Sequence, residues 1–278
     1  MHPVLFQLGP LVVPSYGAVA ALGVLLALGL AQWTARASGL SGAASQQNIG
    51  SRHAWNMLVL AVFAALAVSR LILIVINLSD LRRHPAWLLT VAMVHHPLLA
   101  AAGIVGAIAA VLLYVRWFRL QLPVVADCLA APVSIGLACE QLGALLAGSD
   151  YGRESADGWA VTYTSSLAAR WSGTPLGVPL YPVQTYAAIG ALALTILCLA
   201  WFKLARRPGD VAGVWLSGLG ILIFLTEMFR DWEGRGVLLG GLVNIPQLVG
   251  LGLVVAGGIV LLDLKARRPD AAGDTARP

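Results

Sequence analysis

Charge is scarce in this sequence. Only 11% of the 278 residues are Asp, Glu, Lys or Arg, and the mean hydropathy is +0.81. In an ordinary soluble domain about a quarter of the residues are charged. The composition therefore excludes a typical water-soluble domain and indicates an integral membrane protein.

Cysteine is scarce as well. Cys128, Cys139 and Cys198 each lie in an apolar stretch, and no CxxC spacing occurs. Isolated cysteines in such stretches usually pack as small hydrophobic side chains. They indicate neither a disulfide framework nor a zinc site. The adjacent His95 and His96 have no acidic residue or cysteine nearby, so we expect no metal site and no cofactor.

Long apolar runs are what the sequence has instead. A membrane-spanning helix needs about 20 predominantly apolar residues. Seven segments meet this requirement: Leu11–Trp33, Ala54–Asn77, Pro97–Trp117, Val124–Ala147, Val183–Phe202, Ala212–Phe229 and Asn244–Asp263. The sequence therefore predicts an all-α integral membrane protein with seven transmembrane helices. We expect residues 1–268 to form a single membrane domain and residues 269–278 to form a disordered cytoplasmic tail.

Lys and Arg residues are distributed unequally between the two sides. Loops one, three and five and the C-terminal tail hold eleven of them: Arg36, Arg52, Arg116, Arg119, Lys203, Arg206, Arg207, Lys265, Arg267, Arg268 and Arg277. The other side holds six: Arg82, Arg83, Arg153, Arg170, Arg230 and Arg235. Because short cytoplasmic loops carry the excess of positive charge, we predict the N-terminus outside and the C-terminus inside. Cytoplasmic cations facing anionic lipid explain the pI of about 9.4 without a nucleic-acid partner.

One sizeable loop, residues 148–182, connects the fourth and fifth spans. Residues 159–163 alternate in polarity, which is typical of a short strand. Several Gly and Pro residues follow, as in a compact turn-rich segment. We predict a small extracytoplasmic cap over the end of the membrane domain.

The second predicted span contains Arg70, and the fourth contains Asp127 and Glu140. A charged side chain near the bilayer centre costs about 2.5–3.5 kcal/mol on insertion scales. We therefore expect Arg70 to pair with Glu140 or Asp127; alternatively it joins helices or extends towards the interface. The fourth span ends in a turn-forming run that places Arg153 at the membrane boundary. Together these features predict the wall and mouth of an intramembrane site.

Further polar residues lie close to the ends of other spans. Tyr16 opens the first span, where it is either an interfacial aromatic or part of the site. Gln184 and Tyr186 lie in the first turns of the fifth span. Glu227 and Arg230 are three residues apart and so share a helical face, as a site or as a solvated helix end.

The order of these features resembles the prolipoprotein diacylglyceryl transferase family over nearly the whole chain. The resemblance rests on Phe6-x-Leu-Gly-Pro10, Tyr16-Gly17, Arg70, Gly103-x-x-Gly106, Asp127, Gly148-x-x-Tyr-Gly-Arg153, Trp159-x-Val161, Gly177-Val-Pro-Leu-x-Pro182-x-Gln184-x-Tyr186, Arg207-Pro-Gly-Asp-Val211, Glu227-x-Phe-Arg230 and Pro246-Gln247. No one of these motifs is specific by itself. Their shared order, together with the seven spans, supports the resemblance.

The resemblance implies a reaction and a location. Such an enzyme of the bacterial plasma (inner) membrane transfers a diacylglyceryl group from phosphatidylglycerol to the cysteine thiol of a prolipoprotein signal peptide, releasing glycerol phosphate. A membrane phospholipid and prolipoprotein signal peptides are therefore the expected partners. In this interpretation Glu140 is the catalytic base and Arg153 a catalytic cation. Tyr16, Arg70, Gln141, Gln184, Tyr186, Glu227 and Arg230 are the expected lipid-binding residues.

The chain departs from the family signature at several polar positions. Gln141 stands where the family has Arg, Ala144 where it has Asn, and Ser149 where it has an acid. The family's His-Gly-Gly falls on Ala101-Ala102-Gly103, the arginine of the sixth span on Ile223, and the glutamate of the fifth on Ala187. Three functions therefore stay open: a working transferase, a catalytically silent homologue that binds phospholipid or a membrane partner, and a small transporter lined by Arg70, Asp127 and Glu140.

Overall fold

The computed structural model describes residues 2–8, 11–38, 50–78, 97–205, 207–231, 236–238 and 241–266. Seven helices in these ranges are long and apolar enough to cross a membrane, which confirms the predicted number of spans. They are α1 (Ser15–Ser38), α2 (Ser51–Ile76), α5 (Pro97–Trp117), α6 (Leu122–Ala147), α8 (Val183–Leu204), α9 (Asp210–Glu227) and α10 (Ile245–Ala266).

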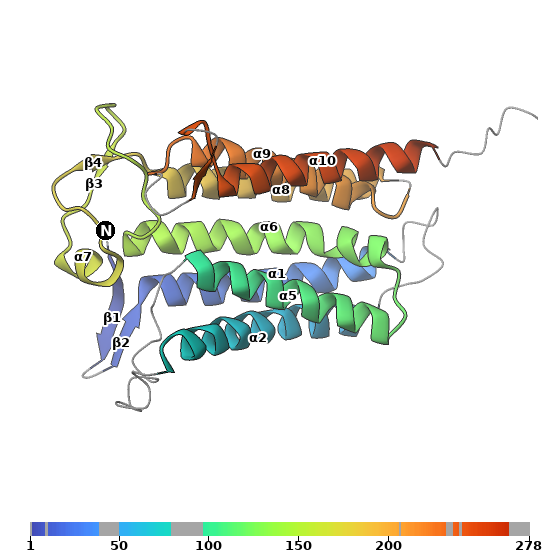
Figure 1. Ribbon diagram of the computed structural model, residues 1–278. Helices are drawn as coiled ribbons and strands as arrows, with labels where there is room; N and C mark the ends of the chain where they lie inside the picture. Colours follow the sequence, from blue (N-terminus) through green and yellow to red (C-terminus); the bar gives the residue numbers. More distant parts are fainter. Residues whose placement is uncertain are drawn as a thin grey trace, which may run out of the picture.

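The seven helices lie side by side with α6 in the middle (Figure 1). On one side α6 packs against α1, and on the other it packs against α8. The remaining helices form two closely packed pairs, α2 with α5 and α9 with α10. Of the seven, α6 has the largest buried share. Its side chains are therefore enclosed by protein more than those of the other six helices.

Glycines allow two of these pairs to approach closely. A Cβ atom on Gly106 of α5 would lie 2.6 Å from Val68 Cγ2 of α2. A Cβ atom on Gly220 of α9 would lie 2.3 Å from the carbonyl oxygen of Gly250 in α10. Small residues at such interfaces let helix backbones touch in lipid, where no hydrophobic effect holds helices together.

Two short antiparallel strand pairs each lie directly before a helix. Strand β1 (Val4–Leu8) pairs antiparallel with β2 (Leu11–Pro14) just before α1. Strand β5 (Val237–Leu238) pairs with β6 (Val243–Asn244) just before α10. The first predicted span was therefore too long at its start. Residues 11–14 are apolar enough for a helix, but they pair with β1, a partner that a hydropathy scan does not detect.

The segment of residues 148–182, here called the cap segment, lies at one end of the bundle (Figure 1). It contains β3 (Val161–Thr162), helix α7 (Ser166–Ser172) and β4 (Pro179–Leu180), with β3 and β4 antiparallel. The predicted strand within residues 159–163 is thus confirmed. Residue 153 lies at this end, whereas α8 ends at the opposite end. Which end faces the cytoplasm stays a prediction, and the predicted tail of residues 269–278 lies outside the described ranges.

Asp127 of α6 forms a contact that positions α9. Its two carboxylate oxygens accept hydrogen bonds from the backbone N–H groups of Gly209 and Ala212, each at 2.7 Å. Gly209 is the N-cap residue of α9 and Ala212 lies in its first turn, where backbone donors lack partners within the helix. The positive end of the helix dipole favours a carboxylate there. Asp127, only 7% exposed, therefore serves as a cap supplied by another helix.

The predicted pairing of Arg70 with Asp127 or Glu140 is wrong. Asp127 is bonded to α9, and Glu140 is bonded to Tyr16 and Gln141. The Arg70 side chain is partly exposed on α2, and α2 makes few contacts with α6. Charge and depth alone suggested this pairing, but α2 and α6 touch at only a few places, and the contacts near Met57 do not involve Arg70.

The orientation can be tested by cysteine labelling, because the native cysteines Cys128, Cys139 and Cys198 are buried and react little. We expect Arg153→Cys to react with an impermeant maleimide added outside spheroplasts, and Lys203→Cys to react only after the membrane is opened. Both positions are exposed. Labelling of residue 203 from outside would reverse the predicted orientation, and labelling of both from one side would contradict the bundle.

The Asp127 cap predicts a stability effect. Asp127→Ala removes two charge-assisted hydrogen bonds and leaves two buried N–H groups without acceptors, so it should destabilise the protein by about 3 kcal/mol. Asp127→Asn keeps an acceptor oxygen and should cost less. Thermal unfolding in detergent would measure both. If both variants lost less than about 0.5 kcal/mol, the charge and hydrogen bonds at this helix end would contribute little.

Candidate functional site

Glu140 lies in the last two turns of α6, where α1 crosses it. The Tyr16 hydroxyl donates to Glu140 Oε1 at 3.3 Å, and Gln141 Nε2 donates to Glu140 Oε2 at 2.5 Å. The crossing is close because Gly143 has no side chain: a Cβ atom there would lie 3.2 Å from the Tyr16 carbonyl oxygen. The glycine therefore brings the phenol within reach of the carboxylate.

Arg230 follows the end of α9 and is only 7% exposed. Its Nη1 donates to the backbone oxygen and to Oδ1 of Asp150, both at 3.1 Å. Its Nε lies 3.3 Å from Glu227 Oε1. One guanidinium therefore joins the turn after α6 to the end of α9.

Glu227 is held from a third element as well. Asn244 Nδ2 donates to Glu227 Oε2 at 3.0 Å. Asn244 and Gln247 also bond each other reciprocally at the start of α10, from N of Asn244 to Oε1 of Gln247 at 3.0 Å and from N of Gln247 to Oδ1 of Asn244 at 2.8 Å. This is the geometry of a capping box. Both Glu227 oxygens thus have partners within the protein.

Around Glu140, the described residues include more carboxylates than cations. Asp150 and Arg230 both act electrostatically on Glu140. Arg230 is the cation of this group, and it already contacts Asp150 and Glu227. We call Glu140, Asp150, Glu227 and Arg230 the charged cluster. Because its guanidinium has carboxylate partners, it offers an incoming phosphate less attraction than an unpaired arginine would.

Gln184 connects the cap segment to the start of α8. Its side chain is fully buried, and Nε2 donates to the Ser149 carbonyl oxygen at 2.6 Å and to the Tyr163 hydroxyl at 2.9 Å. Burial raises the pKa of Tyr163, which keeps the phenol neutral. Gly148 (φ +81°) makes the turn, and a Cβ atom there would lie 3.1 Å from the Tyr163 ring. Gln184 is thus a structural anchor in this structure.

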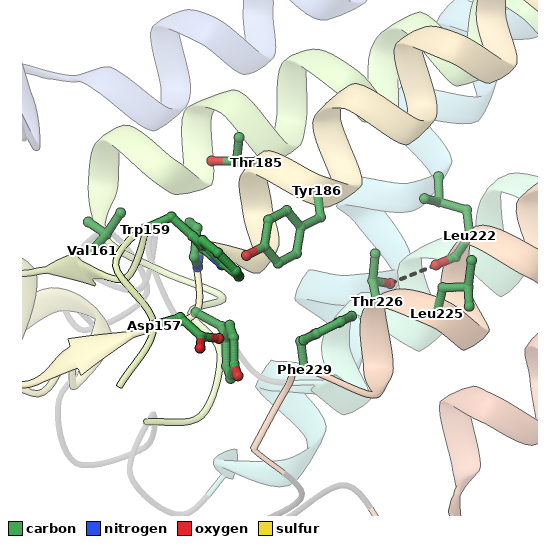
Figure 2. Close-up of a pocket in the computed structure, with 11 residues that line it drawn as sticks. Asp157, Trp159, Val161, Thr185, Tyr186, Leu222, Leu225, Thr226 and Phe229 are labelled. Atoms are coloured by element: carbon green, nitrogen blue, oxygen red, sulfur yellow. Dashed lines mark hydrogen bonds between the residues drawn. The ribbon is translucent and has the colours of Figure 1, made fainter. Parts of the chain in front are cut away.

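A groove lies where the cap segment meets α8 and α9 (Figure 2). Its volume is about 780 Å³, and its walls are mainly aromatic and aliphatic. The lining residues are Asp157, Trp159, Val161, Tyr181, Pro182, Thr185, Tyr186, Leu222, Leu225, Thr226 and Phe229. Phe229 packs edge-on against Tyr181 and Tyr186, with ring centroids 5.3 and 5.5 Å apart. Tyr186 therefore belongs to this groove.

Arg153 lies beside the groove. Its guanidinium carbon is 5.8 Å from the centroid of the Tyr181 ring. Its backbone N–H donates to the Phe229 carbonyl oxygen at 3.0 Å, and the side chain is exposed. Tyr181 and Phe229 both line the groove, so these contacts associate Arg153 with the groove instead of with Glu140.

The described residues contain no group of three His, Cys, Asp or Glu side chains that could hold a metal ion. His95 and His96 lie outside the described ranges. The groups around Glu140 are therefore a phenol, an amide, two further carboxylates and the Arg230 guanidinium.

Known proteins match this chain over nearly its full length. Residues 3–262 match the family described as prolipoprotein diacylglyceryl transferase. The chain belongs to this family. Relatives named phosphatidylglycerol--prolipoprotein diacylglyceryl transferase include one from Vibrio cholerae, 29% identical over 268 residues, which cover 94% of this chain and 91% of the relative. Others come from Vibrio vulnificus (30% identical, 94% and 90% covered) and Aliivibrio salmonicida (28%, 94% and 87%).

Membership of the prolipoprotein diacylglyceryl transferase family agrees with the seven apolar helices. The family is one of bacterial plasma-membrane enzymes, and this chain is accordingly a multi-pass protein of that membrane. The structure divides seven of the nine predicted site residues into three groups, whereas Gln184 anchors the cap segment and Arg70 lies on α2. Tyr16, Glu140 and Gln141 lie together, Glu227 and Arg230 form an ion pair beside them, and Arg153 and Tyr186 lie at the groove.

Several residues that stabilise this site were not predicted from the sequence. Asp150 bonds Arg230, and Asn244 bonds Glu227. A signal existed for each: Asp150 sits between Gly148 and Gly152 in a tight turn, and Asn244 and Gln247 have the spacing of a capping box. Trp159 and Phe229 also line the groove, which only the packing of α9 against the cap segment creates.

The Arg230 contacts predict an unequal response to mutation. Arg230→Ala removes the guanidinium that faces the buried Glu227 and should destabilise the protein by about 3–5 kcal/mol. Asp150→Asn should cost less than about 1 kcal/mol, because the Asp150 side chain is 42% exposed and its backbone oxygen still accepts from Arg230. Asn also tolerates the positive φ of 56° at this position. Urea or thermal unfolding in detergent would compare them, and equal losses would contradict this assignment.

Proposed function

We propose that this protein transfers a diacylglyceryl group from phosphatidylglycerol to the cysteine thiol of a prolipoprotein signal peptide, with Glu140 as the base. The observation that carries the proposal is the Glu140 carboxylate itself. It is enclosed between α1 and α6, oriented by Tyr16 and Gln141, and set in a fold whose relatives are named for this reaction.

Glu140 would act on the thiol. A thiol is a poor nucleophile until it loses its proton, and a carboxylate in a poorly solvated site is a competent proton acceptor. The sulfur would then form a bond to the glyceryl carbon that carries the phosphate ester. The carbon–oxygen bond to phosphate breaks, and glycerol phosphate leaves with the bonding electrons. The Tyr16 hydroxyl would keep the carboxylate oriented through both steps.

The site offers little charge stabilisation to the leaving phosphate. At Gln141 this chain has a neutral amide where the family signature carries arginine, and the Arg230 guanidinium already has two carboxylate partners. Losing one preorganised charge-stabilising group typically lowers a rate by about 10²–10³. We therefore expect slow transfer compared with family members that keep the arginine.

The same observation favours a second candidate, a catalytically silent homologue that binds phospholipid. It would keep the helices, the turns and the groove while lacking the cation for the leaving group. The transporter alternative has less support, because Asp127 caps α9 and Arg70 bonds neither carboxylate. These three residues therefore do not line one polar conduit.

Two substitutions separate these functions. Glu140→Gln should abolish transfer to a lipobox peptide from phosphatidylglycerol vesicles. Gln141→Arg should raise it by about tenfold or more, because arginine adds a bidentate phosphate donor. Gln141→Lys is the matched control, and it should help less because it adds charge without the planar fork. Mass spectrometry of the peptide would report the thioether.

Complementation of a strain depleted of its own transferase provides the cellular counterpart. If neither the wild-type protein nor Gln141→Arg shows turnover in either assay, the enzyme proposal fails and the lipid-binding homologue remains. Full activity of Glu140→Gln would show that another group accepts the thiol proton.

A further inference from the structure

The groove beside α8 and α9 has a position and a surface suited to an acyl chain. It lies at the end of the bundle where α8 begins and α9 ends, which is the boundary of the membrane-spanning region (Figure 1). Leu222 and Leu225 line its membrane side, while Trp159 and Val161 line its cap side (Figure 2). Bilayer lipid surrounds helices at this depth, so a lipid chain is the apolar material at hand.

Two opposite charges flank this apolar surface. Arg153 is exposed and lies over the Tyr181 ring, and Asp157 is half-buried and lines the groove. Among the contacts of the described residues, neither forms an ion pair, with the other or with a third residue. Glu154 is a further exposed carboxylate in this segment. A ligand with one negative charge alone would satisfy Arg153 and leave both acids uncompensated.

We propose that the groove binds a zwitterionic phospholipid with a primary ammonium head group, such as phosphatidylethanolamine. One acyl chain lies between the cap segment and α8 and α9. The phosphate lies against Arg153, whose fork suits phosphate oxygens. The ammonium lies against Asp157, whose oxygens accept its N–H groups. This site does not include Glu140, so lipid binding here is independent of turnover.

The position of Trp159 provides a direct measurement. Indole fluorescence is quenched by bromine atoms on a neighbouring acyl chain, and Trp159 is 64% exposed in the groove wall. The protein has nine tryptophans, so the difference between wild type and Trp159→Phe isolates the signal of this one. The protein would be placed in phosphatidylcholine vesicles containing increasing fractions of brominated phosphatidylethanolamine or brominated phosphatidylglycerol.

We expect half-maximal quenching of Trp159 at about fivefold lower fractions of phosphatidylethanolamine than of phosphatidylglycerol, since only the former satisfies both charges. Asp157→Asn should reduce this preference to near one. Arg153→Gln should weaken both lipids alike, because both carry a phosphate. Thr185→Phe, which fills the groove, should abolish the quenching difference.

Arg170→Gln is the matched control. Arg170 is an exposed arginine of α7 in the same cap segment, and it does not line the groove, so its substitution should leave the lipid preference unchanged. Circular dichroism and gel filtration would verify that each variant keeps its helices and its size.

Several results would overturn the proposal. They are equal or stronger quenching by phosphatidylglycerol, a preference that survives Asp157→Asn, and no quenching difference between wild type and Trp159→Phe. Two competitors test other occupants. Water-soluble glycerophosphoethanolamine that displaced the lipid at equal concentration would show that the acyl chain contributes nothing. Displacement by a lipobox peptide alone would assign the groove to a peptide.

Discussion

A buried guanidinium connects three parts of this structure. Arg230 bonds Asp150 after α6 and contacts Glu227 at the end of α9. Asn244, just before α10, donates a hydrogen bond to the other oxygen of the Glu227 carboxylate. A charge in this position is tolerated only with such partners, because an isolated buried ion is costly to desolvate. The same contacts draw the residues around Phe229 onto the cap segment, where Arg153 N–H bonds the Phe229 carbonyl. Both the surroundings of Glu140 and the shape of the groove therefore depend on this arginine.

The arrangement places two different environments close together. Towards α1, the Glu140 carboxylate is enclosed by protein and bonded by a phenol and an amide. Towards α8 and α9, an apolar groove opens beside Arg153. A reaction between a lipid and a peptide thiol requires a polar centre that excludes water next to surfaces that hold acyl chains. Gln141 belongs to the first environment and does not line the groove.

The sequence predicted those structural features that depend on a short stretch of the chain. The seven spans follow from long apolar runs, and the strand in the cap segment follows from alternation. The pairing of Arg70 was wrong for a definite reason: depth in the membrane says that a charge needs a partner, but it does not say which helix is adjacent. Asp127 is bonded instead to backbone N–H groups at the start of α9. No side-chain pattern in the sequence indicates such a partner.

The sequence by itself determined the membrane class, the number of spans and the family resemblance, and it named most of the polar residues of the candidate site. These properties depend on hydropathy and on residue type, which are local. Only the tertiary structure decided which of those polar residues meet. It brought Tyr16 to Glu140 through a glycine 127 positions later in the chain, Gly143, and it assigned Arg153 to a groove formed by α8, α9 and the cap segment. Such contacts depend on the crossing of helices far apart in the chain, and that geometry arises only when the whole bundle packs.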